Sequence, residues 1–362
     1  MSSEQASLPG KSAMPDEFSP RHLGRRLLGL VLLVALAAGA VSSLPGLGTI
    51  RARFAEADPI LLVIIGLLKL CSCLSNVVAF RDVFCRGMSW RFSFELGMAE
   101  QATNVLLPTG GAGGLALGAW ALRESGMSTE YIARRSVVFF VLTSIPNFLC
   151  AAGVGPLLLA GILPGEAPVV LTAIFTVLAW LVSLFVASLP VLLRRVRPRE
   201  AQSGLGRKLR SGLVALANGI RDTGELLRAR RWRAIGGAFG YMGFDTVALA
   251  VAFAAFGPAL PVGSLIFAYV IGQLGGLIPL PAGIGGTDGG LIGAMVLYGS
   301  PLSQAVAAVL AYRTFQLAVP AVLGTVAFVK LRQRLSRSED PGTTCAPLAH
   351  PRPEEGREHL AA

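Results

Sequence analysis

The sequence is poor in charged residues and nearly lacks histidine. Only 15% of its 362 residues are charged, whereas a soluble domain carries roughly 25%. The three histidines, His22, His350 and His359, lie in polar segments near the two ends. The apolar middle of the chain therefore offers no imidazole. This argues against histidine-held metal sites and against nucleophilic triads with a histidine base.

Cysteine is also scarce, and the apolar runs do not alternate. The chain has five cysteines, none with a spacing typical of a metal site. Apolar residues make up 53% of the chain, and the mean hydropathy is +0.62. Stretches near the membrane-spanning length recur from Leu27 to Phe328. A membrane barrel would show short alternating strands instead. We therefore predict an all-α polytopic membrane protein that has neither cofactor nor metal.

Positive charge is present in excess and is unevenly distributed. The formal net charge is +11. From Arg194 to Arg233 there are twelve Lys and Arg residues against three acids. Such a segment typically faces the cytoplasm, where it contacts anionic lipid headgroups. Leucines recur in it at helical spacing, which predicts an amphipathic surface helix, or alternatively a solvated linker helix. Nucleic-acid binding is disfavoured, because Trp232 is the only aromatic residue in the segment.

The chain divides into five predicted parts. Both termini are expected in the cytoplasm of a bacterial-type cell membrane, because basic residues flank the neighbouring spans. For the first span, a cleaved signal peptide is the alternative. The parts are a disordered leader (1–22), a first membrane half (23–193), the basic segment (194–233), a second membrane half (234–331) and a disordered tail (332–362). The six predicted full spans are 27–44, 59–80, 131–154, 168–193, 234–256 and 302–329.

Each membrane half contains one apolar segment interrupted by proline and glycine. The first lies within 104–126 and the second within 275–299. A shift of 173 residues places Pro108 on Pro281, and likewise places Gly110 and Gly113 on Gly283 and Gly286. Interrupted apolar segments at matching places of two halves are a pointer to a membrane transport site.

The charge bias then constrains the topology. With six full spans, all basic segments reach the cytoplasm only if each motif enters and leaves the membrane on the same side. The two motifs are thus predicted to be re-entrant hairpins of broken helices. Three full spans separate them, so the two halves form an inverted repeat. Non-helical backbone at this depth must be covered by protein or face a water cavity.

The glycines of the motifs are candidate ligand-binding residues. They expose backbone N–H groups and let a helix restart inside the membrane, where its positive end suits an anion such as a lipid phosphate. The alternative is close helix packing through small residues. The candidates, with their neighbouring prolines, are Pro108, Gly110, Gly111 and Gly113 in the first motif and Pro281, Gly283, Gly285 and Gly286 in the second.

Two charged residues accompany the second motif. Asp288 stands where a helix should restart, so it is a candidate N-cap and a candidate counter-ion or proton site. Arg313 lies well inside the last span, a depth that costs roughly 2.5–3.5 kcal/mol on insertion scales. Its guanidinium suits bidentate binding of a lipid phosphate. The alternative for Arg313 is a structural ion pair with Asp288 or Asp245.

Two further charges lie in the middle of predicted spans, Lys69 in the second and Asp245 in the fifth. The 173-residue shift carries Lys69 to position 242, one helical turn from Asp245. We therefore predict an intramembrane charge pair between them across the axis that relates the two halves. The same shift places Glu100 on Gln273, each on the first arm of its hairpin. Glu100 either continues a polar path to a cavity or lies on an ordinary exposed helix face.

The sequence around both motifs resembles the transmembrane region of lysylphosphatidylglycerol synthases. The segments that carry the resemblance are LPTGGAGG in the first half and IPLPAGIGGTDGG followed by AVLAYR in the second. That family usually has Glu where Asp288 stands. The resemblance implies a flippase-like protein that handles a phospholipid or a polyprenyl-linked lipid. No aminoacyl-transfer domain accompanies the membrane body in this sequence, so the chain is not expected to be an enzyme.

Two other functions remain open at this stage. One is a membrane transferase that acts on a lipid carrier, which would need paired carboxylates or a metal cluster. The other is a non-catalytic subunit of an envelope lipid or glycan synthesis complex, whose partner would be an envelope-synthesis enzyme. The sequence does not determine the oligomeric state.

Overall fold

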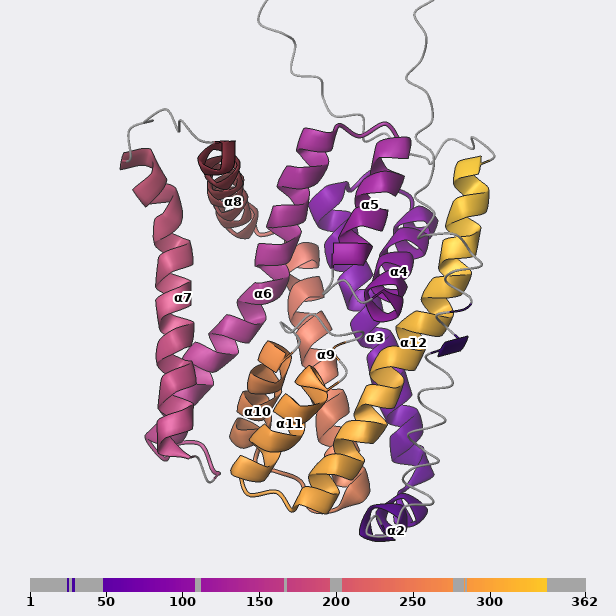
Figure 1. Ribbon diagram of the computed structural model, residues 1–362, viewed down its shortest axis with the longest axis vertical. Coiled ribbons are helices and arrows are strands. Elements are labelled where there is room, and N and C mark those ends of the chain that lie inside the picture. The colour runs from indigo at the N-terminus through magenta and orange to yellow at the C-terminus, as the bar shows by residue number, and fades with distance from the viewer. Residues whose placement is uncertain are drawn as a thin grey trace, which may run out of the picture.

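The fold is an all-α bundle, shown as a computed structural model in Figure 1. The structure describes residues 25, 28–29, 48–107, 112–165, 168–195, 204–275, 283 and 285–336. Within these residues no β-strand occurs. The helices are α2 (Gly48–Glu56), α3 (Pro59–Phe84), α4 (Trp90–Leu106), α5 (Ala112–Glu124), α6 (Thr129–Leu159), α7 (Val169–Arg195), α8 (Gly204–Arg228), α9 (Trp232–Phe256), α10 (Val262–Gly275), α11 (Gly286–Leu297) and α12 (Leu302–Ser336).

Five of these helices are long and apolar enough to cross a membrane. They are α3, α6, α7, α9 and α12, and they coincide with five of the six predicted spans. The remaining predicted span, 27–44, lies largely outside the described residues, as do the whole leader and most of the tail. The prediction of an all-α polytopic membrane protein is therefore confirmed.

The two motif regions form pairs of shorter helices. In Figure 1, α4 and α5 lie side by side in the upper half of the bundle, and α10 and α11 lie in the lower half. Each pair begins and ends near the same end of the bundle. The long helices between the pairs run from one end to the other, so the pairs open towards opposite ends.

The 173-residue shift seen in the motifs also relates the helices. It carries the first residues of α3 and α6, Pro59 and Thr129, onto the first residues of α9 and α12, Trp232 and Leu302. It also superposes α4 on α10 and α5 on α11 to within one residue at their starts. The contacts between helices also correspond in the two halves. Helix α4 packs on α12 as α10 packs on α6, and α3 packs on α12 as α9 packs on α6.

Helices α3 and α9 correspond to each other under this shift, and they pack together along much of their length. Their close approach depends on small residues. A Cβ at Gly237 of α9 would lie 2.7 Å from the backbone nitrogen of Ala79 and from the carbonyl oxygen of Ser75 on α3. No side chain fits there without separating the helices, so glycine at this position sets the distance between the two halves.

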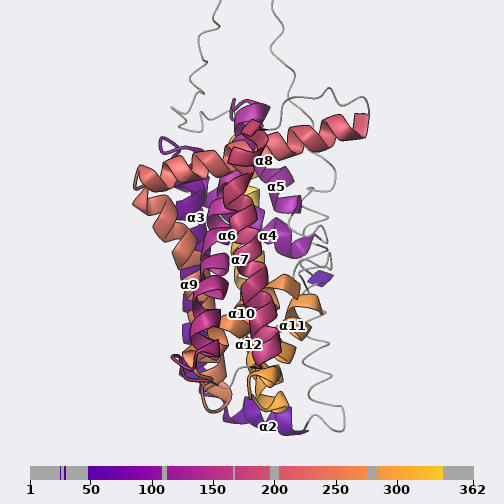
Figure 2. The same ribbon diagram turned by 90° about the vertical axis from the view of Figure 1, so that its left-hand side faces the viewer.

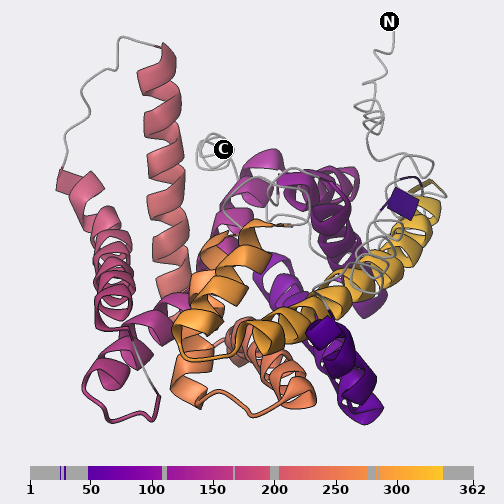
Figure 3. The same cartoon turned by 60° about the horizontal axis from the view of Figure 1, so that its bottom comes forward.

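Helix α8 lies across the upper end of the bundle rather than along it. Figure 2 shows it nearly perpendicular to the long helices, and Figure 3 shows it beside α7 at the side away from α12. Leu226 and Ala217 are buried against the protein, whereas Arg221, Arg228 and Arg230 are exposed. Arg134 of α6 forms an ion pair with Asp222, which fastens α8 to the bundle.

One helix was not expected from the sequence. The short helix α2 lies at the lower end of the bundle (Figure 1), just before α3 begins at Pro59. The Arg53 side chain donates hydrogen bonds to Phe256 O at the end of α9 and to Ser303 near the start of α12. A mixed segment of nine residues has no clear hydrophobic periodicity, which is why the sequence pattern did not reveal it.

Candidate functional site

The candidate site centres on the start of α11. The backbone N–H of Gly285, the N-cap residue, donates to Asp288 Oδ2 over 2.9 Å. Asp288 thus takes the third position of the helix and neutralises part of its positive end. The first N–H groups of any helix lack partners inside it. This end of α11 is therefore a place where anions are stabilised, and Asp288 supplies the negative charge in this structure.

Arg313 of α12 reaches the same place. Its Nε donates to Asp288 Oδ1 over 2.6 Å, and its Nη1 donates to Gln316 Oε1 over 2.6 Å. The arginine is only 7% exposed, whereas the side chain of Asp288 is 21% exposed. The ion pair joins a buried cation to a more accessible carboxylate. Asp288 is thus the counter-ion of Arg313, but the prediction that it is the N-cap residue is wrong: Gly285 takes the N-cap position, and Asp288 accepts the N-cap N–H from the third position of the helix.

The glycines beside Asp288 are required by the backbone path. Gly283 and Gly285 have φ values of +67° and +89°, in the left-handed region that other residues rarely adopt. A side chain at position 283 would also point at Thr287 Oγ1, 2.7 Å away, and towards the Arg313 guanidinium. Substitution at either glycine would therefore move the start of α11 away from Arg313.

Gly286 has a different function, because it lies where α10 and α11 meet. The carbonyl group of Gly286 occupies the space that a Cβ at Gly275 would fill. The two backbones are thus in direct contact at the inner end of this helix pair, in keeping with small residues that let helices approach in a membrane.

The first motif is less polar. Gly113 lies in the first turn of α5, and the N–H of Gly114 donates to Asn104 Oδ1 of α4 over 2.8 Å. This bond ties the start of α5 to α4. Four predicted site residues, Pro108, Gly110, Gly111 and Pro281, lie outside the described residues.

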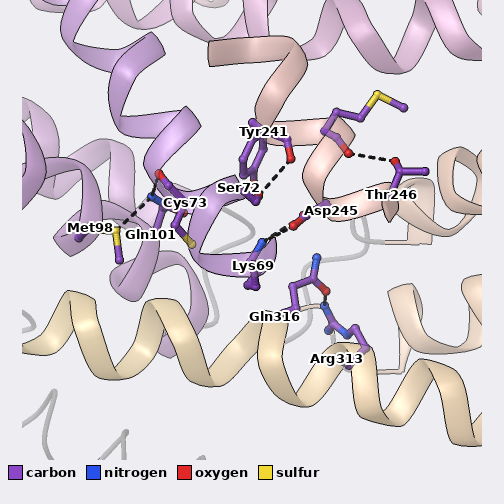
Figure 4. Close-up of polar contacts among 11 residues, drawn as sticks. Lys69, Ser72, Cys73, Met98, Gln101, Tyr241, Asp245, Thr246, Arg313 and Gln316 are labelled. Atoms are coloured by element: carbon purple, nitrogen blue, oxygen red, sulfur yellow. Dashed lines mark hydrogen bonds and ion pairs between the residues drawn. The ribbon is translucent and has the colours of Figure 1, made fainter. Parts of the chain in front are cut away.

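The structure brings Lys69 and Asp245 together, as Figure 4 shows. Lys69 Nζ lies 2.7 Å and 3.1 Å from the two carboxylate oxygens of Asp245. Both residues are buried, with 4% and 1% of their surface exposed. Lys69 also lies over the ring of Tyr241, 5.6 Å from its centroid. The charges therefore stabilise each other inside the α3–α9 interface.

Two buried tyrosines lie near this central pair. Tyr269 of α10 and Tyr312 of α12 both lie within electrostatic range of Asp245. Tyr312 directly precedes Arg313 in the chain and is buried. A shift of α12 relative to α9 would therefore change the surroundings of Asp245 and of Arg313 together.

Gln316 is a site residue that the sequence analysis missed. It lies three residues after Arg313, which places the two side chains on the same face of α12. That spacing was available in the sequence, but a glutamine among apolar residues carries no charge to mark it. Its amide oxygen holds Arg313 in the orientation that faces Asp288, as the hydrogen bond in Figure 4 illustrates.

The family model described as the lysylphosphatidylglycerol synthase TM region matches residues 26–324. The match includes both helix pairs, the central pair and Arg313. No curated protein matches the chain.

Proposed function

We propose that this chain, which belongs to the lysylphosphatidylglycerol synthase TM region family, moves lipids with an anionic headgroup between the leaflets of a membrane. Its family and its five apolar helices make it an integral membrane, lipid-related protein. Transport is the further step, and it concerns a phospholipid or a polyprenyl-linked lipid. In this proposal the chain acts without a chemical reaction on the lipid.

The observation that carries the proposal is the buried Arg313 held beside the start of α11. A guanidinium offers paired N–H donors that match a phosphate, and a helix start adds backbone N–H groups. In the described conformation Asp288 fills that anionic position. We infer that a lipid phosphate takes the place of the Asp288 carboxylate when the headgroup binds.

The arrangement of the helices supports alternating access. Two helix pairs that open towards opposite ends, and packing that is preserved when the two halves are exchanged, are what an inverted repeat requires. In such a protein one half adopts the arrangement of the other, so the headgroup site opens first to one side and then to the other. The central Lys69–Asp245 pair lies in the interface of the two exchanged helices.

The charges at the upper end support an orientation in the membrane. Arg134, Arg221, Arg228 and Arg334 belong to helix segments at that end of Figure 1. We propose that this end faces the cytoplasm at a bacterial-type cell membrane, with both termini on that side, because the positive-inside rule favours basic residues there. Helix α8 then lies on the inner leaflet with its arginines against anionic headgroups.

A reorientation assay tests the proposal. The purified full chain is reconstituted into vesicles that contain a labelled anionic phospholipid, and a membrane-impermeant quencher reports the label that remains outside. Wild-type protein should speed the exchange of label between leaflets well above protein-free vesicles. The Arg313→Ala variant should return the rate close to the protein-free value. Equal rates with and without the wild-type protein, across several anionic lipids, would refute transport.

A further inference from the structure

Glu100 occupies an unusual place in the first helix pair. It lies on the inner part of α4 and is partly buried. Its carboxylate occupies the space that a Cβ at Gly118 of α5 would fill. We call the contact of Glu100 and Asn104 on α4 with Gly114 and Gly118 on α5 the α4–α5 seam. An acidic side chain is therefore enclosed in this seam.

The other acids inside the bundle have basic partners. Four buried acids each form an ion pair: Asp82 with Arg86 and Arg231, Glu95 with Arg334, Asp222 with Arg134, and Asp245 with Lys69. Asp288 is paired with Arg313. Glu100 forms no hydrogen bond or ion pair with any residue that the structure describes. An ionised carboxylate in such a place is disfavoured by the loss of water, whereas the protonated form is not.

The equivalent place in the second half is built without a charge. The 173-residue shift places Glu100 on Gln273 and Gly118 on Leu291. There the Leu291 side chain packs over Gly272 of α10, and Gln273 lies next to the Tyr269 hydroxyl. Glutamine has nearly the shape of a protonated glutamate and carries no charge. The second helix pair is thus closed with a permanently neutral group where the first pair has a titratable one.

No cation on the neighbouring helices is positioned to replace a proton. Helices α3, α5 and α12 pack against α4. On α3, Lys69 and Asp82 are used in ion pairs, and Arg81 donates to backbone carbonyls near Met88. On α5 the charges, Arg123 and Glu124, lie in the last turn, away from the inner end. On α12, Arg313 and Arg334 pair with Asp288 and Glu95, and Lys330 and Arg332 are exposed. On α4 itself Arg91 is exposed.

We propose that Glu100 is a proton-binding site and that its protonation closes the α4–α5 seam. When the seam opens, water reaches the carboxylate, which releases its proton. When the seam closes, the carboxylate takes a proton from that water before it is buried against Gly118. No other bond forms or breaks. Each opening of the first helix pair thus releases one proton and each closing takes one up, so the pair opens more readily as the pH on its side of the membrane rises. The coupling to lipid rests on the proposed function, but the proton site does not.

Infrared spectroscopy of the full chain in lipid nanodiscs tests the site directly. The wild type should show the C=O absorption of a protonated carboxyl group at neutral pH, and Glu100→Gln should lack it. Gly118→Ala should lower the pH at which this band disappears, because the added Cβ pushes the carboxylate out of the seam. Glu130→Gln, an exposed acid in the first turn of α6, is the control and should leave the band unchanged.

The outcomes separate a proton site from other possibilities. A spectrum of Glu100→Gln identical to that of the wild type between pH 4 and pH 9 would overturn the proposal. So would a band that appears or disappears when sodium is replaced by choline at constant pH, because it would indicate a metal-cation site.

The closure of the seam is measured with spin labels at positions 91 and 123, which are exposed on α4 and α5. In the wild type the distance between the labels should lengthen as the pH rises, and in Glu100→Gln it should stay short at every pH. A distance that changes with pH equally in both proteins would overturn the proposal. If both proton measurements succeed while vesicles show no lipid movement, the proton site stands and the proposed transport fails.

Discussion

Lys69 and Asp245 join the two halves of the protein by an ion pair of 2.7 Å inside the α3–α9 interface. They come from helices that the 173-residue shift exchanges, and they are buried almost completely. A buried ion pair stabilises little compared with apolar side chains, but the loss of one partner leaves an uncompensated charge. Its value here is to select one alignment of α3 against α9.

This leads to a prediction about charge exchange. Lys69→Asp or Asp245→Lys alone should destabilise the protein strongly, on the order of 3–5 kcal/mol, because two like charges are then buried together. The double variant should recover much of that loss. Thermal melting and the yield of monodisperse protein in detergent measure both effects. If the double variant is no more stable than the single variants, the two residues do not interact energetically.

Arg313 should determine which lipid the purified protein retains. Mass spectrometry of lipids bound to the wild type should show an anionic class that is lost in Arg313→Ala. Arg313→Lys keeps the charge but lacks the paired donors of a guanidinium, so it should retain an intermediate amount. Loss of the lipid in Arg313→Ala with full retention in Arg313→Lys would mean that charge alone is recognised. Equal retention in all three proteins would place the headgroup site elsewhere.

Asp288 should compete with the lipid phosphate while it stabilises α11. Asp288→Ala should cost about 0.3–1 kcal/mol of stability, because the helix start loses the negative charge in its first turn and the acceptor of the Gly285 N–H. Asp288→Asn retains an acceptor for the Gly285 N–H and should cost less. Both variants free Arg313 from its internal counter-ion, so both should retain more anionic lipid than the wild type. A decrease in retained lipid in Asp288→Asn would instead indicate that the carboxylate helps to bind the headgroup.

Helix α8 should bind the anionic surface of the membrane through its exposed arginines. Replacement of Arg221 and Arg228 by Gln should weaken this attraction by about 1 kcal/mol per charge at low salt. Energy transfer from a fluorophore at the exposed Ala229 to labelled anionic lipids in nanodiscs measures the enrichment. Zwitterionic acceptor lipids provide the control. If salt and the two substitutions leave the enrichment unchanged, α8 does not contact anionic headgroups.

Much of the architecture was predictable because membrane spans are local features. A run of apolar residues such as Ala234–Phe256 satisfies its own backbone hydrogen bonds as a helix, whatever its neighbours are. The boundaries of α9 and α12 accordingly lie within a few residues of the prediction at their starts. The pairing of Lys69 with Asp245 was also predictable, because the 173-residue repeat shows that the two residues occupy nearly equivalent positions in the two halves.

The sequence alone determined that this protein is helical, spans a membrane and repeats one motif at a distance of 173 residues. Hydropathy, glycine and proline act over a few neighbouring residues, and those can be read in order along the chain. Only the tertiary structure decided that Gln316 orients Arg313, that Gly237 sets the spacing of the two halves and that Glu100 lies against Gly118. These contacts depend on which faces of distant helices meet. The packing of the whole bundle determines those faces, and no local sequence pattern encodes it.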